Sequence, residues 1–155
     1  MRLLLQRVSQ ASVSVDDETV GEITGGLLVL IGITHGDTIE IGRRLLSKAL
    51  DLRIFEDDAG KMNRSLRELA AGDPGAWGVL LVSQFTLYAD TRKGRRPSFT
   101  DAAAPDIANV LIESMAIEIR SSGISCATGR FGAHMRVSLV NDGPVTILLD
   151  SADIA

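Results

Sequence analysis

Residues 25–33, GGLLVLIGI, form an apolar run bounded by glycines that has the right length for a β-strand. No polar residue interrupts the run, which favours a central strand buried within a sheet. A second run of this kind, WGVLLVSQF, occupies residues 77–85. A sheet built on two such strands must be covered by other elements, so the rest of the chain has to supply amphipathic helices.

Two segments have the periodicity of such helices. In residues 37–52 the apolar side chains recur at intervals of three and four, and Asp37 followed by Glu40 predicts a capping box at the start. Residues 105–123 begin with a proline, which suits a first helical turn, and end with a glycine. The apolar positions are Ile41, Leu45, Leu46, Ala49 and Leu52 in the first segment, and Ile107, Val110, Leu111, Met115 and Ile119 in the second.

The remaining segments favour strands and turns. The predicted strands are RLLLQRV (2–8), ASVSV (11–15), TVGEI (19–23), ISCAT (124–128), HMRVSLV (134–140) and VTILLD (145–150), with RIFEDDAGKMN (53–63) as a short strand, a turn and an edge, and residues 70–78 as a surface loop. This order predicts an α+β fold: a single domain over residues 1–155 with a mixed or antiparallel, barrel-like β-sheet and two main helices.

Charge, cysteine content and the length of the apolar segments indicate in which compartment the protein works. The net charge of -4 argues against broad nonspecific binding to nucleic acid and leaves a local basic patch open. The single cysteine, Cys126, can form neither an internal disulfide nor a zinc site alone, which agrees with a reducing compartment. No segment approaches the roughly 20 apolar residues of a membrane span or the core of a signal peptide. We therefore expect a cytoplasmic protein with no membrane partner.

The common catalytic signatures are absent. The sequence contains no GxSxG elbow, no Walker loop, no HExxH and no paired cysteines, so we expect no metal and no cofactor. Its two histidines, His35 and His134, could be placed in a Ser-His-Asp triad only arbitrarily. His134 is read as a surface or strand-end residue rather than a general base.

The polar SQFT segment, residues 83–86, follows directly on the second buried run. Ser83 and Gln84 would stand where the strand leaves the core, and free backbone N–H groups at such a point can stabilise a developing oxyanion. Thr86 offers a hydroxyl that would need a base to become a nucleophile. The alternative is structural, with Ser83 and Thr86 pairing across strands and Gln84 capping a turn.

Three further segments combine features of binding sites and of ordinary turns. RKGRRP (92–97), near Tyr88 and Phe99, has the basic and aromatic side chains that bind single-stranded RNA, although a solvated hairpin tip explains it equally. In NDGPVT (141–146), a glycine before a proline allows close approach of a ligand, or simply makes a hairpin turn. In GRFGA (129–133), two glycines leave room for a base against the phenylalanine ring, or bend a strand.

Taken together, these segments resemble the D-aminoacyl-tRNA deacylases of the widespread bacterial and eukaryotic type. The resemblance runs the length of the chain in the family's order. It is carried by MRLLLQRVSQASVSV, RIFEDDAGKMN, SQFTLYADTRKGRRPSFT, TGRFGAHM and VSLVNDGPVT, of which SQFTLY and NxGPVT are the family's own signatures. Two departures are an imidazole at position 134, where the family commonly carries an acid, and a longer loop at residues 70–77.

The resemblance implies hydrolysis of the ester between a D-amino acid and the 3′-terminal adenosine of tRNA, and removal of glycine from mischarged tRNA. It implies a homodimer with active sites at the interface. It further implies that Gly143-Pro144 is cis, projects into the partner's pocket and excludes L-amino acids through its main-chain carbonyls. Arg7 would steady that loop, and Phe131 would form the wall that holds the adenosine.

The resulting candidate residues fall into three groups. They are Gln84, Phe85 and Thr86 for catalysis; Gly143 and Pro144 for chiral selection; and Ser83, Arg7, Phe131, Gly132, Ala133, Met135, Asn141, Val145 and Thr146 for substrate binding. We expect a mechanism of water attack aided by oxyanion donors and by the free ribose hydroxyl, with a Thr86 nucleophile as the alternative. The competing functions are a nucleic-acid-binding module without catalysis and a small-molecule esterase that uses Thr86.

Overall fold

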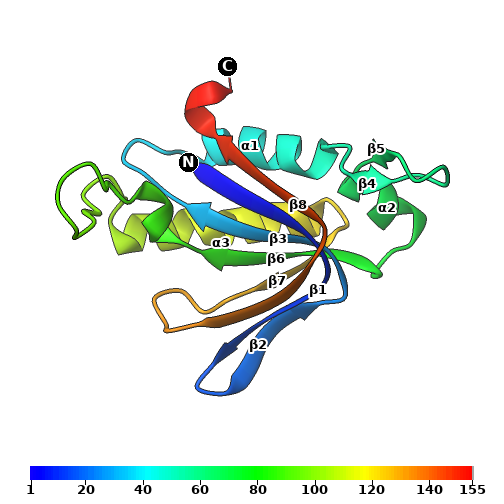
Figure 1. Cartoon of the computed structure of the whole chain (residues 1–155), viewed down its shortest axis with the longest axis horizontal. Coiled ribbons are helices and arrows are strands. Elements are labelled where there is room, and N and C mark those ends of the chain that lie inside the picture. The colour runs from blue at the N-terminus through cyan, green and yellow to red at the C-terminus, as the bar shows by residue number, and fades with distance from the viewer. Residues whose placement is uncertain (155) are drawn as a thin grey trace.

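The long first strand organises the sheet because it pairs with three other strands. The computed structural model describes residues 1–154 (Figure 1). Its strands are β1 (Arg2–Val15), β2 (Glu18–Ile23), β3 (Gly25–Gly32), β4 (Phe55–Glu56), β5 (Met62–Arg64), β6 (Trp77–Ser83), β7 (Ser125–Thr128) and β8 (Arg136–Asp150), and its helices are α1 (Ile39–Asp51), α2 (Leu66–Gly72) and α3 (Pro105–Ser121), with short 3-10 turns η1 (Phe85–Tyr88) and η2 (Ser151–Asp153). The first half of β1 pairs with β3, the second half with β2, and β8 pairs along most of its length.

The sheet is mixed and curled. Its main order is β2-β1-β3-β6-β7, with β8 on β1. The β3–β6 and β6–β7 pairs are parallel, and the pairs that involve β1 are antiparallel. Because β1 extends past β3 to pair with β2, the sheet bends into a half-barrel, which confirms the predicted single α+β domain with a mixed, barrel-like sheet.

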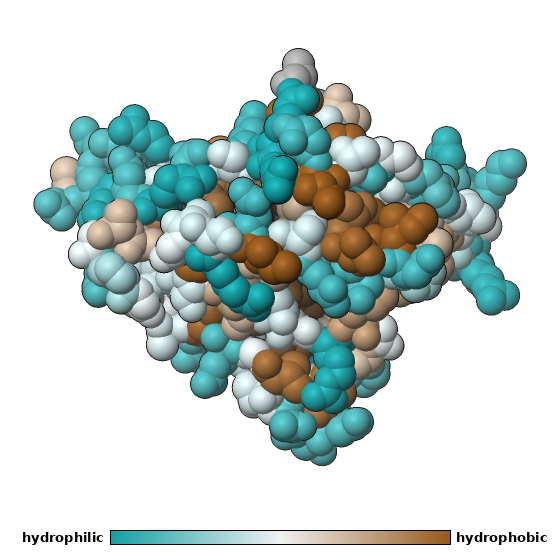
Figure 2. All heavy atoms as spheres, turned by 180° about the vertical axis from the view of Figure 1, so that it is seen from behind, coloured by the Kyte–Doolittle hydropathy of each residue, from teal (hydrophilic) through white to brown (hydrophobic). Residues whose placement is uncertain are grey.

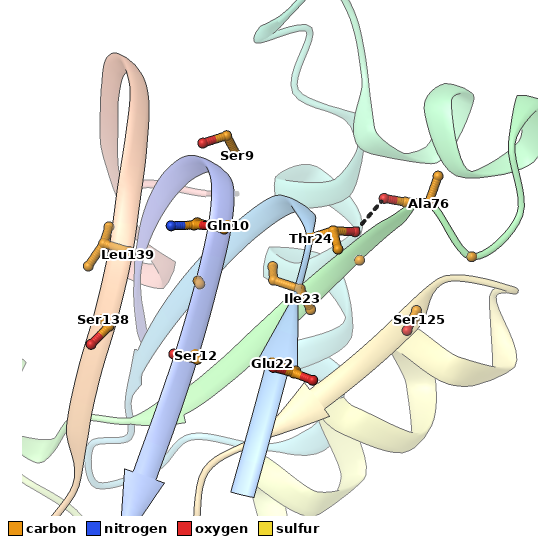
Figure 3. Close-up of a pocket in the computed structure, with 13 residues that line it drawn as sticks. Ser9, Gln10, Ser12, Glu22, Ile23, Thr24, Ala76, Ser125, Ser138 and Leu139 are labelled. Carbon is orange, nitrogen blue, oxygen red and sulfur yellow. Dashed lines mark hydrogen bonds between the residues drawn. The ribbon is translucent and has the colours of Figure 1, made fainter. Parts of the chain in front are cut away.

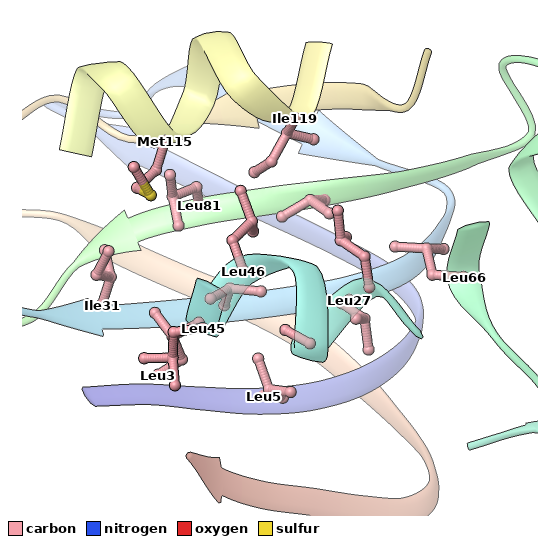
Figure 4. Packing of buried hydrophobic residues seen from close by; sticks show 14 of the residues in the cluster. Leu3, Leu5, Leu27, Ile31, Leu45, Leu46, Leu66, Leu81, Met115 and Ile119 are labelled. Atoms are coloured by element: carbon pink, nitrogen blue, oxygen red, sulfur yellow. The ribbon is translucent and has the colours of Figure 1, made fainter. Parts of the chain in front are cut away.

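The helices cover one face of this sheet, behind the strands in Figure 1. The main core lies between them and β1, β3 and β6, with Leu45 and Leu46 of α1 and Met115 and Ile119 of α3 pointing toward the strands (Figure 4). A Cβ on Gly42 would lie 2.6 Å from the Met115 sulfur, so the glycine allows α1 and α3 to approach closely. A second core cluster fills the concave side of the half-barrel and includes Val13, Leu28, Leu80 and Val82.

The two predicted main helices are α1 and α3. A third, shorter helix, α2, begins with a Ser65–Glu68 capping box and covers residues 70–72, which were expected to lie in a loop. A second local expectation was wrong at the start of α1. The capping box expected from Asp37 and Glu40 does not form, because Thr38 is the N-cap of α1. Asp37 instead accepts hydrogen bonds from the Met1 ammonium group (2.7 Å) and from the Thr34 backbone N–H (2.8 Å). No helix in residues 1–154 is both long and apolar enough to cross a membrane.

The two ends of the chain form longer strands than predicted. The segments 2–8 and 11–15 merge into β1, and the last two predicted strands merge into β8. In the β1–β8 register, Gln6 pairs with Thr146 and Val8 with Asn141, so residues 142–145 form a bulge opposite Arg7 alone. The hairpin turn considered for residues 141–144 is therefore wrong: the segment is an insertion within one continuous strand.

Candidate active site

A cavity of about 640 Å³ lies where β6 ends, between η1, the segment that leads into α3, and the loop between β7 and β8. Its volume is within the usual range of small-molecule sites. Seven of the sequence-predicted residues line it: Ser83, Gln84, Phe85, Phe131, Gly132, Ala133 and Met135. Segments far apart in the chain thus meet here, because β6 lies beside β7 in parallel and the β7–β8 loop returns over the end of β6.

The end of β6 is held in place by its neighbour β3. The Gln84 N–H donates to the Ile31 carbonyl at 2.8 Å, one residue beyond the strand, and the chain then turns into η1. A Cβ on Gly32 would lie 3.0 Å from the Leu87 Cβ, so the glycine allows this turn to pack directly on β3. The polar end of the strand is therefore a fixed edge of the cavity rather than a mobile loop.

The first turn of η1 leaves backbone donors unused. No side chain caps it, and within residues 1–154 the N–H groups of Phe85 and Thr86 have no hydrogen-bond acceptor. The Gln84 side-chain amide donates to Thr86 Oγ1 at 2.5 Å, which is the one side-chain contact of that hydroxyl in this part of the chain. An amide cannot take a proton from the threonine, so nothing in this contact activates Thr86 as a nucleophile. Thr86 itself does not line the cavity.

The opposite wall comes from the segment before α3. The Ala103 N–H donates to the Ile33 carbonyl at 2.9 Å, and Thr34 Oγ1 donates to the Asp101 carbonyl at 2.5 Å. These bonds fix three consecutive small residues, Ala102 to Ala104, along the cavity. Sequence reasoning missed them, because a run of alanines carries no functional group that would indicate a site.

Phe131 is presented by a tight turn. The Ala133 N–H donates to the Arg130 carbonyl at 3.2 Å, which places Phe131 and Gly132 at the two central positions. Gly132 has φ +75°, a left-handed conformation that favours glycine at the second of these positions. Across the cavity, the exposed ring of Phe85 packs edge-on against Phe99, with centroids 5.0 Å apart. Aromatic side chains therefore stand on both sides of the opening.

The Gly143–Pro144 pair lies in the exposed bulge of β8, and its peptide bond is cis. Arg7, only 6 % exposed, anchors the bulge: its Nε donates to the Asp142 carbonyl and its Nη1 to the Ile54 carbonyl, both at 2.7 Å. Asn141 closes the base of the bulge. Its Oδ1 accepts from the Val145 N–H at 2.8 Å, and its Nδ2 donates to Thr146 Oγ1 at 2.9 Å.

This bulge stands apart from the cavity of its own chain. Arg7 pairs with Leu27 near the start of β3, whereas Ser83 pairs with Ile31 near its end. Leu27 and Ile31 are four residues apart in β3, which at about 3.3 Å per residue is roughly 13 Å along the strand. In addition, β1 and β8 lie on the far side of β3 from β6. The predicted residues thus form two groups, and Arg7, Asn141, Gly143, Pro144, Val145 and Thr146 lie outside the cavity lining.

The basic loop at residues 91–97 extends from the mouth of the cavity. An isolated bridge between Asp90 and Ser98 closes it. Arg92 donates two hydrogen bonds of 2.9 Å to the Asp90 carboxylate, and this contact lowers the pKa of Asp90 to about 2. Within the described residues, Lys93, Arg95 and Arg96 have no carboxylate within 4 Å, so their charges face solvent.

The two histidines have different settings. His35 Nε2 is 2.8 Å from the Thr100 carbonyl and helps to hold the segment before α3. His134 is exposed and lines the cavity. Across residues 1–154, no group of three His, Cys, Asp or Glu side chains is arranged to bind a metal ion.

A larger hollow, about 680 Å³, lies among β1, β2, β7 and β8 and shares no residue with this cavity. It is lined mainly by hydroxyl and amide groups, including Ser9, Gln10 and Ser138, and Thr24 donates across it to the Ala76 carbonyl (Figure 3). None of the sequence-predicted site residues lies there. Seen from behind relative to Figure 1, the surface is mainly hydrophilic, interrupted by apolar groups (Figure 2). Three large apolar side chains of α3 are exposed: Ile107, Val110 and Ile117.

Comparisons with known proteins identify the family. A family model described as D-Tyr-tRNA(Tyr) deacylase matches residues 4–150. Curated proteins named D-aminoacyl-tRNA deacylase are 59% identical in Roseiflexus sp. (98% of this chain and 94% of that protein) and 55% identical in Thermomicrobium roseum (99% and 96%).

Solved structures give the same result for the fold. A structure titled c-Myc DNA Unwinding Element Binding Protein is 37% identical with a TM-score of 0.88, over 97% of this chain and 98% of that one. A probable eukaryotic D-amino acid tRNA deacylase, 21% identical over 96% and 97% of the two chains, has the same fold with a TM-score of 0.79. The chain therefore belongs to the D-Tyr-tRNA(Tyr) deacylase family of hydrolases.

Proposed function

We propose that this protein hydrolyses the ester bond of D-aminoacyl-tRNA in the cavity at the end of β6, releasing the free D-amino acid and tRNA. The observation that carries the proposal is the combination of an aromatic-flanked cavity with unused backbone N–H groups at Phe85, which lines it, and at the adjacent Thr86. Family membership supplies the substrate class. The site of action is the cytoplasm, where charged tRNA is used in translation.

The chemistry requires no side-chain nucleophile. Water adds to the ester carbonyl carbon, the carbonyl oxygen becomes an oxyanion, and the bond to the ribose oxygen breaks as that oxygen takes the proton lost by water. The free N–H groups at the start of η1 suit the oxyanion, since backbone donors fixed before the reaction stabilise charge without reorganisation. The neighbouring ribose hydroxyl is the substrate's own proton carrier. Ser83 and Gln84 position the aminoacyl group at the end of the strand.

The terminal adenosine occupies the apolar part of the cavity. Phe131 offers a ring for the base, and the alanine wall leaves space on the other side. Stacking of a base on an aromatic side chain contributes about 1–3 kcal/mol. The unpaired charges of Lys93, Arg95 and Arg96 lie on the loop that continues from Phe85 and Phe99, where they would attract the tRNA phosphates. A local basic loop of this kind gives attraction at the site in a chain of net charge -4.

Chiral selection comes from a second copy of the chain. The exposed Gly143–Pro144 bulge is rigidly anchored by Arg7 and Asn141, yet it is remote from the cavity of its own subunit. In a two-fold dimer the same bulge enters the cavity of the partner, and its main-chain carbonyls exclude an L side chain. A filter that senses only the L side chain accepts D-amino acids and also glycine, so glycyl-tRNA is a second substrate.

The deciding experiment incubates the purified protein with D- and L-forms of the same aminoacyl-tRNA, with glycyl-tRNA, and with a free D-amino acid ester. We expect rapid loss of the D-aminoacyl and glycyl esters and survival of the L-ester. Survival of every ester together with tRNA binding would instead indicate a nucleic-acid-binding module. Equal cleavage of the free D-amino acid ester would indicate a small-molecule esterase. A matched variant, Ala104→Trp, should fill the cavity and lower D-specific turnover, whereas the surface control Ala152→Trp should not.

A further inference from the structure

A second cavity, of about 490 Å³, adjoins the active-site cavity between α3 and β7. The two share Ser83, Ile112 and Phe131, so the aromatic ring stands at the boundary between them. The remaining walls of the second cavity include Asn109 and Glu113 of α3 and two arginines. The hydrolysis described above uses none of these polar side chains.

The arginines give one side of this cavity a positive charge. Arg120 is held by the Cys126 carbonyl, which accepts from its Nε at 3.1 Å and from its Nη2 at 3.0 Å, so that its Nη1 is left without a partner among the described residues. Arg130 directly precedes Phe131, and its nearest carboxylate, that of Glu18, is 4.0 Å away. Neither cation is held in a close ion pair, and both remain available to a phosphate.

The opposite side presents a donor beside an acceptor. Asn109 Nδ2 donates to Glu113 Oε1 at 3.0 Å across one turn of α3, which fixes the two side chains together. The Asn109 amide retains a second N–H, and the carboxylate retains acceptor capacity. The base-pairing edge of cytosine carries the complementary pattern, an amino donor next to a ring-nitrogen acceptor. At the same two positions uracil carries the reverse pattern, a carbonyl acceptor next to a ring N–H donor.

We propose that the second cavity binds the penultimate cytidine of the tRNA 3′ end, an inference that rests on the proposed function. With the terminal adenosine against one side of Phe131, the chain of the tRNA must leave past the same ring. Its linking phosphate meets Arg130 and Arg120, and the cytosine reaches Asn109 and Glu113. Phe131 then separates the two bases and contacts both, which aligns the ester with the end of β6.

Aminoacyl esters of adenosine and of short dinucleotides measure the contribution of the second cavity separately from the rest of the tRNA. D-aminoacyl esters of adenosine, of cytidylyl-adenosine and of uridylyl-adenosine, all with the same amino acid, should be compared with full-length D-aminoacyl-tRNA. For the wild type we expect kcat/KM for the cytidylyl-adenosine ester to exceed that for the adenosine ester about tenfold, mainly through KM, since a charge-assisted phosphate contact has about that effect. The uridylyl ester should fall below the cytidylyl ester.

Two variants test the phosphate contact and the base contact separately. Arg130→Gln should lower kcat/KM for the cytidylyl ester about tenfold relative to the adenosine ester, and Glu113→Ala should reduce the preference for cytidine over uridine. Arg44→Gln, an exposed arginine on α1, is the matched control and should leave these ratios unchanged. Equal kcat/KM for the adenosine and cytidylyl esters in a wild type that hydrolyses D-aminoacyl-tRNA would overturn this inference alone. A wild type inactive on D-aminoacyl-tRNA would overturn the proposed function, and this inference with it.

Discussion

Arg7 of β1 donates a 2.7 Å hydrogen bond to the carbonyl of Asp142, the residue that precedes the exposed Gly143–Pro144 pair. The guanidinium is almost fully buried; it also donates to the Ile54 carbonyl and lies 3.9 Å from the Glu56 carboxylate. One buried side chain therefore determines where an exposed bulge stands. This arrangement suits the proposed role of the bulge, in which it enters a partner subunit without losing its shape.

Replacing Arg7 with methionine should destabilise the fold by about 2–4 kcal/mol, because two carbonyls lose their donors in a buried setting. Urea unfolding measures the change in free energy. The control is Arg136→Met, which removes the exposed pair between Arg136 and Asp17 and should change stability by less than about 0.5 kcal/mol. Equal effects of the two substitutions would show that Arg7 does not anchor the bulge.

The backbone N–H of residue 85, the proposed oxyanion donor, can be removed by a substitution that keeps the conformation of the turn. Phe85→Pro eliminates the backbone N–H at the first position of η1, where proline is tolerated. Loss of one oxyanion donor should lower kcat on D-aminoacyl-tRNA by about 10²–10³-fold. Phe85→Ala also loses the ring but keeps the N–H, so the difference between the two variants isolates the donor. If both variants had the same kcat, the backbone mechanism would be rejected.

Thr86→Ala should retain most of the turnover, because within residues 1–154 the side-chain contact of the hydroxyl is with the Gln84 amide, which cannot take its proton. Single-turnover rates on D-aminoacyl-tRNA check this directly. Complete loss of hydrolysis, with intact folding and tRNA binding, would favour a Thr86 nucleophile instead.

The sequence predicted the central strands because their signal is local. The glycine-bounded runs that became β3 and β6 needed no knowledge of their partners. The same reasoning failed at residues 141–144, since the turn chemistry of Asn, Asp, Gly and Pro suits a hairpin and a bulge equally, and only the long pairing of β8 with β1 decides between them. The helix α2 was missed because its seven residues are too few for a clear periodicity.

The site was predictable in part for a similar reason. Polar residues at the end of a buried strand, such as Ser83, indicate from sequence alone where the strand leaves the core and a site can begin. That Phe131 lies beside Ser83 depends on the parallel pairing of β6 with β7, a contact between residues far apart in the chain. The alanine wall before α3 carries no chemical signal, because its contribution is the absence of side chains. The separation of Gly143 from the cavity also became visible only from the strand register.

The basic loop should respond to acid through Asp90. The hydrogen bonds from Arg92 lower the pKa of this carboxyl from 3.8 to about 2. A depressed pKa means that the contact is fully present above the unfolded value and is lost as the pH falls from about 4 through 2. Carboxyl chemical shifts followed by NMR should give a midpoint near pH 2 in the wild type. In Arg92→Gln the midpoint should rise toward 3.8; an unchanged midpoint would mean that the pair does not form in solution.

In the proposed dimer, each active site combines the cavity of one subunit with the Gly143–Pro144 bulge of its partner. Two inactive variants test this together. Phe85→Pro disables the cavity. Gly143→Ala disables the bulge, because a Cβ at this residue, with φ +142°, would lie 2.8 Å from the Val145 side chain and 3.1 Å from Arg7 Nη2.

The decisive measurement is the D-aminoacyl-tRNA hydrolysis rate of the two variants after they are unfolded together and refolded as a mixture. Random pairing makes half of the dimers mixed, and each mixed dimer contains one site with an intact cavity and an intact bulge, so we expect about a quarter of the wild-type rate. If the mixture stayed as inactive as either variant alone, although mixed dimers had formed, the shared site would be contradicted.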